Sequence, residues 1–349
     1  MIRDKVTLVT GAAGFVGTNL ADRLLRDGET VRVLDDLSRP GVERNLAWLE
    51  ARHGGRLQVE VADVCDGTVV ARAVAGARSV FHFAAQVAVT TSLGDPAHDL
   101  AVNLLGTLNV LEALRRERGG APVVFTSTNK VYGALDDIAL RQAAARHEPV
   151  DGALRAFGVP ETRPLAFSTP YGCSKGAADQ YVLDWQKSYG LATAVFRMSC
   201  VYGPHQLGTE DQGWVAHFLI SALAGEPITI YGDGKQVRDL LFVEDLVEAL
   251  LAARATMGAI AGRAFNIGGG PANVVSLREV TGLIAGLTGA EPELRFGPWR
   301  TGDQRWYVSD LRAFAAATGW RPTTSPREGV ARLHDWLVEE STQAVAEAA

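Results

Sequence analysis

Short apolar, β-branched runs alternate with amphipathic stretches along the N-terminal part of the chain. Continuous apolar runs are typical of strands buried on both faces, and such strands form parallel sheets. We predict strands at Val6–Thr10, Val31–Asp35, Leu57–Val61, Val80–Ala84, Val123–Ser127 and Ala192–Met198, and helices at Val16–Arg26, Ala97–Arg116 and Tyr171–Tyr189. The alternation predicts an α/β fold with a doubly wound parallel sheet covered by helices on both faces.

The pattern loosens after about residue 203, where Gly and Pro interrupt shorter segments. We predict a first domain of residues 1–203, with residues from about 237 to 265 packing back onto its sheet. A smaller α/β substrate lobe would comprise residues 204–236 and 266–340. The segment Ala134–Phe167 is polar and is predicted to be an irregular insertion, and loops of that length are typically functional or mobile.

A glycine-rich turn, TGAAGFVG at residues 10–17, joins the first strand to the first helix. Glycine permits a tight turn and close approach of a pyrophosphate, which the helix N-terminus then faces. The spacing is GxxGxxG, and an ordinary glycine-rich turn is the alternative reading. Its position after the first strand, with an acid ending the second, favours a Rossmann-type cofactor site.

That acid is Asp35, which can accept hydrogen bonds from an adenosine ribose and repels a 2′-phosphate. It therefore favours NAD over NADP, although Arg39 lies nearby in the sequence. Asp63-Val64, after the third strand, lies where an adenine is expected, and a loop-capping role for Asp63 is the alternative. The fourth strand ends in Phe83-Ala84-Ala85-Gln86, whose small alanines leave room for a cofactor backbone.

Tyr171 and Lys175 are four residues apart and therefore share one helix face. An ammonium beside a phenol favours the phenolate, so we expect Lys175 to lower the pKa of Tyr171. Tyr171 would exchange the substrate hydroxyl proton, Thr128 would orient that hydroxyl, and Lys175 would also hold the nicotinamide ribose. A Tyr/Lys pair at this spacing is often a surface pair, but here it follows a glycine turn and a strand ending in TST.

Thr128 is followed by Asn129 and Lys130 rather than by two carboxylates. A dehydratase needs an acid to protonate the departing hydroxyl and a base to remove the neighbouring proton. An amide can be neither, and a lysine of ordinary pKa is a poor base. The segment therefore favours reversible oxidation of an alcohol over loss of water, unless Glu210 or Asp211 enters the site from elsewhere.

Two arginines, Arg238 in GDGKQVRD and Arg305 in GDQR, are candidate diphosphate ligands. A guanidinium matches phosphate oxygens two at a time, but a surface ion pair is an equal alternative for each. The stretch EDQGW at residues 210–214 is a candidate wall of a sugar or base pocket, or Asp211 simply caps the following helix.

Charge, cysteine spacing and hydropathy argue against several classes of partner. The 349 residues carry a net charge of −6 without long runs of one sign, which argues against nucleic acid as a partner. Three cysteines without metal-type spacing suit a reducing cytoplasm, and we assign no metal site. We expect no leader peptide and no membrane partner, because no apolar stretch reaches membrane-spanning length.

Taken together, these motifs resemble the extended short-chain dehydrogenase/reductases that act on nucleotide-sugars. Within them the chain is most similar to the CDP-paratose/CDP-tyvelose 2-epimerases, through TSTNKVYG, YGCSKGAADQY, EDQGWV and GDGKQVRD. The resemblance implies tightly bound NAD, transient oxidation at C2 of the sugar, hydride return to the opposite face, and a homodimer or homotetramer. It also implies that Asn103, in NLLGT, contacts the cofactor.

These considerations give three sets of candidate residues. The catalytic set is Thr128, Tyr171 and Lys175. The cofactor set is Gly11, Gly14, Phe15, Val16, Gly17, Asp35, Asp36, Ser38, Arg39, Asp63, Val64, Phe83, Ala84, Ala85, Gln86, Asn103, Thr126, Tyr171, Lys175 and Val201. The substrate set is Gln86, Thr128, Asn129, Ser199, Cys200, Gln212, Gly213, Arg238 and Arg305.

The chain departs from the family at Ser168 and Met198, where His is expected. Both positions are expected near the sugar, so the sugar and the oxidised carbon stay open. The same three catalytic residues also serve 4-epimerisation or keto-sugar reduction. A regulator that senses NAD without turnover is the non-enzyme alternative, against which the intact set argues.

Overall fold

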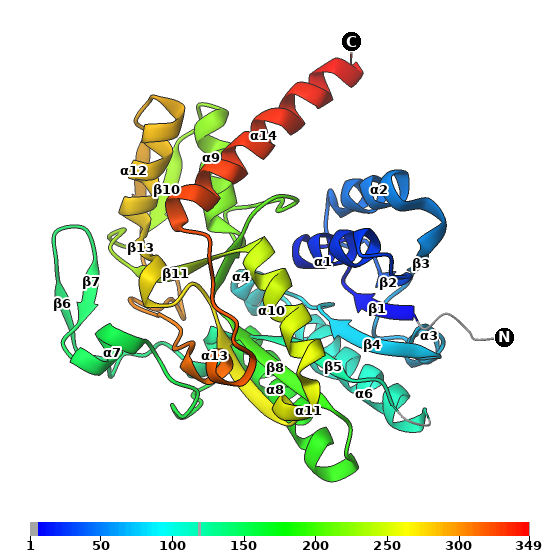
Figure 1. The fold of residues 1–349 in the computed structure, drawn as a ribbon. Helices are drawn as coiled ribbons and strands as arrows, with labels where there is room; N and C mark the ends of the chain where they lie inside the picture. Colours follow the sequence, from blue (N-terminus) through cyan, green and yellow to red (C-terminus); the bar gives the residue numbers. More distant parts are fainter. Residues whose placement is uncertain (1–5, 118–119, 349) are drawn as a thin grey trace.

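A seven-stranded parallel sheet forms the centre of the computed structural model, which describes residues 6–117 and 120–348 (Figure 1). Its strands are β1 (Val6–Thr10), β2 (Val31–Asp35), β3 (Leu57–Val61), β4 (Ala77–His82), β5 (Val123–Thr128), β8 (Thr193–Met198) and β12 (Arg263–Ile267). They are ordered β12-β8-β5-β4-β1-β2-β3. The predicted doubly wound sheet is confirmed.

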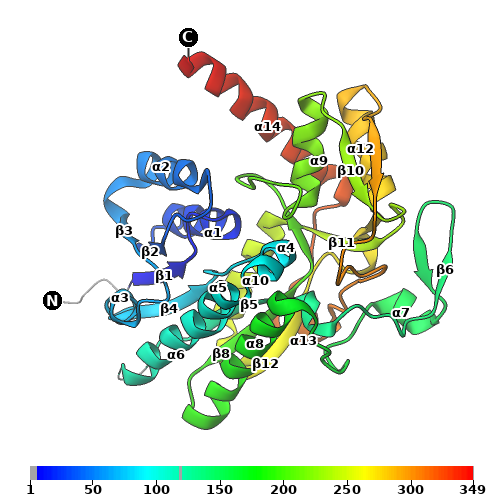
Figure 2. The ribbon, with the colours of Figure 1, turned by 180° about the vertical axis from the view of Figure 1, so that it is seen from behind.

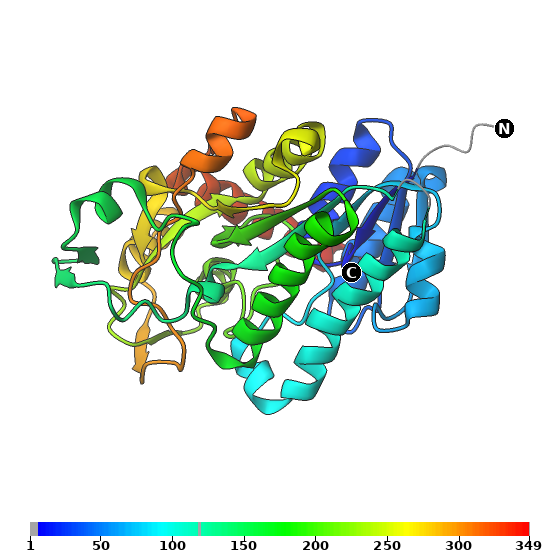
Figure 3. The same ribbon diagram turned by 90° about the horizontal axis from the view of Figure 1, so that it is seen from below.

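Each face of the sheet is covered by helices, as its apolar strands require. One face packs against α1 (Phe15–Arg26), α2 (Val42–His53) and α10 (Val243–Ala255) through Val9, Val33 and Phe196. The other packs against α3 (Gly67–Val74), α6 (Gly106–Arg116) and α8 (Thr169–Tyr189) through Leu8, Phe125 and Val195. The view from below shows both layers (Figure 3).

Two predicted elements differ from the structure by more than a shift of one or two residues. The predicted helix Ala97–Arg116 is a succession of α5 (Pro96–Leu100), a π-helical segment η2 (Ala101–Leu105) and α6. β4 ends at His82, because the next two residues turn toward β1. The amides of Phe83 and Ala84 both donate to the Thr10 hydroxyl, at 3.2 Å each. The chain thereby leaves the sheet where the glycine turn of residues 10–17 begins.

Smaller sheets and helices lie beyond the carboxyl ends of β5 and β8 (Figure 2). The strands are β9 (Cys200–Tyr202), β11 (Val237–Phe242) and β13 (Val274–Ser276) in one sheet, and β10 (Ile228–Tyr231) with β14 (Leu294–Gly297) in another. The helices of this region are α9 (Trp214–Leu223), α12 (Leu277–Thr288) and α14 (Pro326–Ala348), whereas α13 (Arg312–Thr318) packs against β12 of the central sheet. Short elements elsewhere in the chain are α4 (Val89–Gly94), α11 (Met257–Ile260), η1 (Gly54–Arg56), η3 (Asn129–Tyr132) and η4 (Pro271–Asn273). The two-domain boundaries proposed from the sequence stay a prediction.

The insertion Ala134–Phe167 is more regular than we predicted. It contains a hairpin of β6 (Leu140–Gln142) and β7 (His147–Pro149), followed by α7 (Gly152–Phe157). The expectation of an irregular segment was wrong because the strands are three residues long, too short for a periodic signal. An ion pair between Arg141 and Glu148, at 2.6 Å, joins the two strands.

A buried ion pair attaches α8 to the sheet. Arg197 of β8 and Asp179 of α8 form two hydrogen bonds of 2.9 and 3.0 Å, with side chains 5% and 0% exposed. The pairing raises the pKa of Arg197 despite its burial. A charge in such a place is tolerated only with its partner.

We predict that Asp179→Ala lowers the free energy of unfolding by about 3–5 kcal/mol, because it leaves Arg197 buried and unpaired. Urea unfolding followed by fluorescence measures the change. Glu293→Ala is the control, since its pair with Arg295 is about two-thirds exposed and should contribute less than about 1 kcal/mol. Equal losses in the two variants would contradict the assignment.

Candidate active site

Two adjoining cavities lie at the carboxyl ends of the central strands. One, of about 650 Å³, follows the ends of β1, β2, β4 and β5. The other, of about 570 Å³, lies between β5, α9 and the segment 299–303. Seven residues line both: Val87, Thr128, Tyr171, Met198, Ser199, Asp211 and Gln212. A ligand in either cavity therefore meets the same hydroxyl groups.

The glycine turn forms one end of the 650 Å³ cavity. The N-cap Gly14 makes no side-chain capping bond, and α1 carries no acid in its first turn. A Cβ on Gly11, which has a φ of 68°, would lie 2.6 Å from the Ala84 nitrogen. A Cβ on Gly17 would lie 2.3 Å from the Gly11 oxygen. The close packing and the uncapped helix end fit a dinucleotide pyrophosphate.

The acidic residues of this cavity already hold backbone amides. The two carboxylate oxygens of Asp35 accept from Ala13 at 2.9 Å and from Leu37 at 3.0 Å. Burial raises the pKa of Asp35, and those hydrogen bonds oppose the effect. Asp63 accepts from the Cys65 amide at 2.8 Å, so it caps its own loop and also lines the cavity. The Arg39 guanidinium donates to the Leu207 carbonyl at 3.0 Å.

Every residue of the predicted cofactor set lines this cavity except Asn103. Its side chain is buried and donates to Asp99 at 3.1 Å and to Ser174 at 3.0 Å. Asn103 therefore contacts α8 through Ser174 and does not line the cavity. The motif NLLGT does not indicate this contact, because Asn103 lies in the π-helical segment η2, which the sequence pattern did not predict.

Thr128, Tyr171 and Lys175 converge, as predicted. Thr128 ends β5, and its hydroxyl accepts from the Lys130 amide at 3.2 Å. Tyr171 lies in the first turn of α8. Lys175, one turn later, donates to the Thr126 carbonyl at 2.7 Å, with its nitrogen 4.3 Å from the centre of the Phe125 ring.

The expected lowering of the tyrosine pKa was wrong for this structure. Burial raises the pKa of Tyr171 to about 12, although its hydrogen bond with Thr128 acts in the opposite direction. Burial also lowers the pKa of Lys175 to about 7, with Asp179 and Asp99 opposing. The ammonium is directed at the Thr126 carbonyl, and desolvation outweighs any help it gives the phenol.

The 570 Å³ cavity holds most of the predicted substrate set. Thr128, Asn129, Ser199, Cys200, Gln212, Gly213 and Arg238 line it, whereas Gln86 lines the neighbouring cavity. The aromatic side chains Trp214, Phe218, Tyr231 and Trp299 line it as well. Such a surface, apolar with a few placed charges, suits a sugar nucleotide.

Arg305 is the exception in that set. It lines neither cavity; it is exposed, with its guanidinium 5.2 Å from the Trp299 ring centre. Arg300 lines the 570 Å³ cavity instead, 3.9 Å from the Tyr231 ring centre. Sequence reasoning missed Arg300, whose signal was its position just before the turn at Gly302-Asp303.

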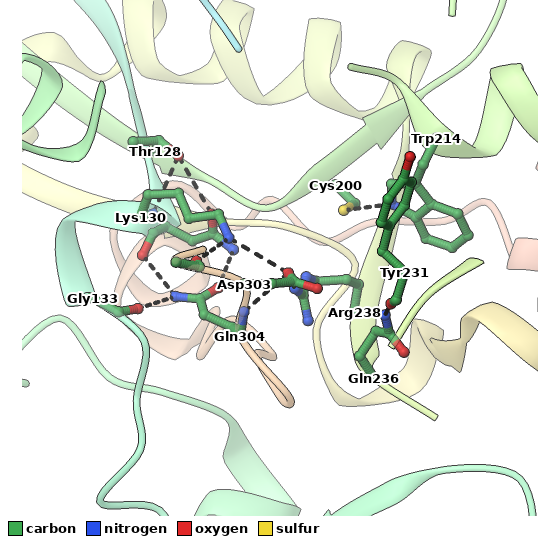
Figure 4. A network of polar contacts seen from close by, with 12 residues as sticks. Thr128, Lys130, Gly133, Cys200, Trp214, Tyr231, Gln236, Arg238, Asp303 and Gln304 are labelled. Carbon is green, nitrogen blue, oxygen red and sulfur yellow. Dashed lines mark hydrogen bonds and ion pairs between the residues drawn. The ribbon is translucent and has the colours of Figure 1, made fainter. Parts of the chain in front are cut away.

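Polar contacts fix the segment that follows Thr128 (Figure 4). Asn129 donates to the Gln304 side chain at 3.2 Å, and Gln304 donates to the Gly133 carbonyl at 2.7 Å. Lys130 donates to the Gly302 carbonyl at 2.9 Å. Burial lowers the pKa of Lys130 to about 8, so the assumption of an ordinary pKa was wrong. The case against dehydration now depends on Asn129, on the engaged ammonium, and on the pairing of Glu210 and Asp211, which line the cavity, with Arg300.

Four other positions named in the sequence analysis, Glu210, Asp211, Met198 and Ser168, differ in whether they line the cavities. Glu210 and Asp211 line the cavity near Arg300, at 3.7 and 3.4 Å, and the N-cap of α9 is Gly213. Asp211 therefore does not cap that helix. Met198 lines both cavities, but Ser168 lines neither and is the N-cap residue of α8.

The chain is similar in sequence and in fold to several nucleotide-sugar epimerases. The chain is 40% identical to CDP-paratose 2-epimerase of Salmonella typhi, over 94% of this chain and 98% of the relative. It is 35% identical to UDP-glucose 4-epimerase of Mycolicibacterium smegmatis, over 96% and 99%. The crystal structure of Thermus thermophilus UDP-glucose 4-epimerase in complex with NAD has a TM-score of 0.79 and 33% identity, over 95% of this chain and 99% of that one.

The family described as "NAD dependent epimerase/dehydratase family" matches residues 7–268. These residues include the glycine turn, the three convergent side chains Thr128, Tyr171 and Lys175, and the strand that ends the central sheet. The chain therefore belongs to the NAD dependent epimerase/dehydratase family.

Proposed function

We propose that this protein is an NAD-dependent nucleotide-sugar epimerase that inverts C2 of a CDP-linked hexose or deoxyhexose. The observation that carries the proposal is the position of Thr128 and Tyr171, which line both cavities. One pair of hydroxyl groups thus faces a cofactor on one side and a sugar on the other. The 40% identity to a CDP-paratose 2-epimerase supports the CDP and C2 parts of the proposal.

NAD fits the 650 Å³ cavity. The uncapped start of α1 and the glycine turn would hold its pyrophosphate, and Asp35 would accept from the adenosine ribose. When bound, NAD supplies a reversible hydride acceptor beside Tyr171. Because the hydride returns to the sugar, the cycle consumes no cofactor, and tight binding follows as an expectation.

Tyr171 would exchange the proton of the reacting sugar hydroxyl, with the Thr128 hydroxyl as its hydrogen-bond partner. A phenol with a pKa of about 12 holds its proton at neutral pH and needs positive charge nearby to release it. Lys175 would supply part of that charge, from a position fixed by the Thr126 carbonyl.

The diphosphate would bind along the 570 Å³ cavity. Arg238 is 8% exposed at its side chain and contacts Asp303 at 2.6 Å. Arg300 lies against Tyr231, at the aromatic end of the cavity where the base would stack. We propose Arg238 and Arg300 as diphosphate contacts. Arg305 would act indirectly, by supporting Trp299.

A nucleotide-sugar 4-epimerase or keto-sugar reductase is the second candidate, because the same three side chains serve either reaction. The 35% identity to a UDP-glucose 4-epimerase favours the first of these. Met198, at the junction of the cavities, is the residue best placed to influence which carbon is presented. An NAD-sensing regulator is disfavoured by the assembled Thr128, Tyr171 and Lys175.

We further propose a cytoplasmic homodimer or homotetramer. Leu100 and Leu105 are 46% and 48% exposed beside α8, whose Tyr181 and Tyr189 are 43% and 54% exposed. Packing of these side chains against a second copy of the chain would remove apolar area from water.

The three cysteines are free thiols, as in a reducing compartment. In the described ranges, no helix has the length and hydropathy to cross a membrane.

A panel of CDP-, UDP-, GDP- and dTDP-sugars, incubated in D₂O without added cofactor, tests the function. We predict inversion at C2 of a CDP-sugar with unchanged mass and no solvent deuterium at the inverted carbon, measured by NMR and mass spectrometry. Inversion at C4 would establish the second candidate. Accumulation of a keto product lacking one water, or a need for stoichiometric NADPH, would contradict the epimerase assignment.

The acid–base role predicts that Tyr171→Phe reduces kcat roughly 10²- to 10⁴-fold while NAD binding and thermal stability are retained. Thr128→Val should cost less, because Thr128 assists the transfer without being its main agent. Tyr181→Phe, on the exposed part of the same helix, is the matched control. A loss of less than tenfold in Tyr171→Phe would remove that residue from the role.

The two arginines near Trp299 should differ in their effect on binding. Arg300→Ala should raise the Kd for CDP or UDP by a factor equivalent to roughly 1.5–3 kcal/mol, the usual loss of a charge-assisted hydrogen bond. Arg305→Ala should change it less, because Arg305 lies outside the cavity. Calorimetric titration measures both. A larger effect of Arg305→Ala would restore it as the direct diphosphate ligand.

A further inference from the structure

The ionisable groups of the 570 Å³ cavity sum to no net charge. Its lining contains three cations, Lys130, Arg238 and Arg300, and three carboxylates, Glu210, Asp211 and Asp303. Any nucleotide-sugar carries two negative charges on its diphosphate at neutral pH. A cavity with no excess positive charge attracts such a ligand only where its charges are unevenly distributed.

The charges are in fact divided between rim and interior. Arg300 faces both Glu210 and Asp211, and the two carboxylates are 46% and 49% exposed. Arg238 and Asp303 form the interior pair, with side chains 8% and 21% exposed. Each of these groups has a partner of opposite sign.

Lys130 is the additional interior cation. Its ammonium donates to a neutral carbonyl, that of Gly302, and lies 3.7 Å from the Asp303 oxygen that Arg238 already contacts at 2.6 Å. Its side chain is 20% exposed. Figure 4 shows Lys130 on the Thr128 side of Asp303 and Arg238 on the other. The interior of the cavity therefore has one net positive charge, and Lys130 provides it.

We propose that Lys130 is a further substrate-binding residue, which binds the phosphate nearest the sugar. This inference rests on the proposed nucleotide-sugar function and assigns a second interior cation to it. With the sugar at Thr128 and the base at the aromatic end, the sugar-proximal phosphate passes Lys130 before it reaches Arg238. Without this ammonium, the diphosphate would enter a neutral interior behind an acidic rim.

The proposal has a pH signature that an arginine could not give. Lys130 has a pKa of about 8, lowered by burial and raised again by Asp303. Arg238 and Cys200 also face it, and burial raises the pKa of the Cys200 thiol. A bound anion stabilises the ammonium form. Affinity should therefore be full below pH 8 and should fall as the pH rises through 8.

The experiment is a calorimetric titration with CDP-glucose between pH 6.5 and 9.5 and with UDP-glucose up to pH 8.5, because the diphosphates keep a constant charge but the uracil ring loses a proton at higher pH. For the better ligand, we expect Lys130→Met to weaken binding roughly 10- to 100-fold at pH 7 and to remove the pH dependence. Lys130→Arg should restore affinity and keep it constant over the same pH range. Binding of cytidine, which has no phosphate, should be unaffected in both variants.

Lys235→Met is the matched control, because Lys235 also donates to a backbone carbonyl, that of Ala143 at 3.2 Å, but lies outside the cavity. The proposal is overturned if Lys130→Met binds as tightly as the unaltered protein, or if it keeps the fall in affinity above pH 8. If the unaltered protein binds neither sugar nucleotide, the proposed function itself fails. Circular dichroism of each variant verifies that the fold is retained.

Discussion

The attachment of α8 to the central sheet is the interaction on which the site depends. Tyr171, Lys175 and Asp179 succeed one another at intervals of four residues, so they lie along one face of this helix. Asp179 holds the buried Arg197 of β8, and Lys175 holds the Thr126 carbonyl at the end of β5. These two contacts fix the register of α8, and Tyr171 is placed against Thr128 as a consequence.

The same contacts explain why a protonated phenol and a weakly basic lysine coexist. Both groups are shielded from water, and desolvation disfavours the charged form of each. Asp179 and Asp99 oppose this effect at Lys175, but desolvation outweighs them. Under the proposed function, Tyr171 therefore needs positive charge beside it to release its proton.

The segment after Thr128 separates this chain from one that expels water. Asn129 is held by Gln304, and Lys130 by the Gly302 carbonyl, so both side chains belong to a fixed wall. That wall comes from residues more than 170 positions apart in the chain. The C-terminal segment that supplies Gln304 also supplies Arg300 and Asp303. The same segment therefore forms part of the cavity wall and contributes both a positive and a negative charge to it.

The sequence by itself determined the central sheet and most of the residues that line the two cavities. Continuous apolar strands require cover on two faces, and glycine turns and strand ends have local chemical signatures, so Gly11, Asp35, Thr128 and Tyr171 could be found from neighbouring residues alone. Only the tertiary structure decided matters that depend on distant groups. Asn103 contacts Ser174 of α8 instead of lining the cavity, and Arg300 rather than Arg305 lines the cavity. Burial raises the pKa of Tyr171 and lowers the pKa values of Lys175 and Lys130. Desolvation and long-range pairing depend on the whole packed chain, and no local pattern encodes them.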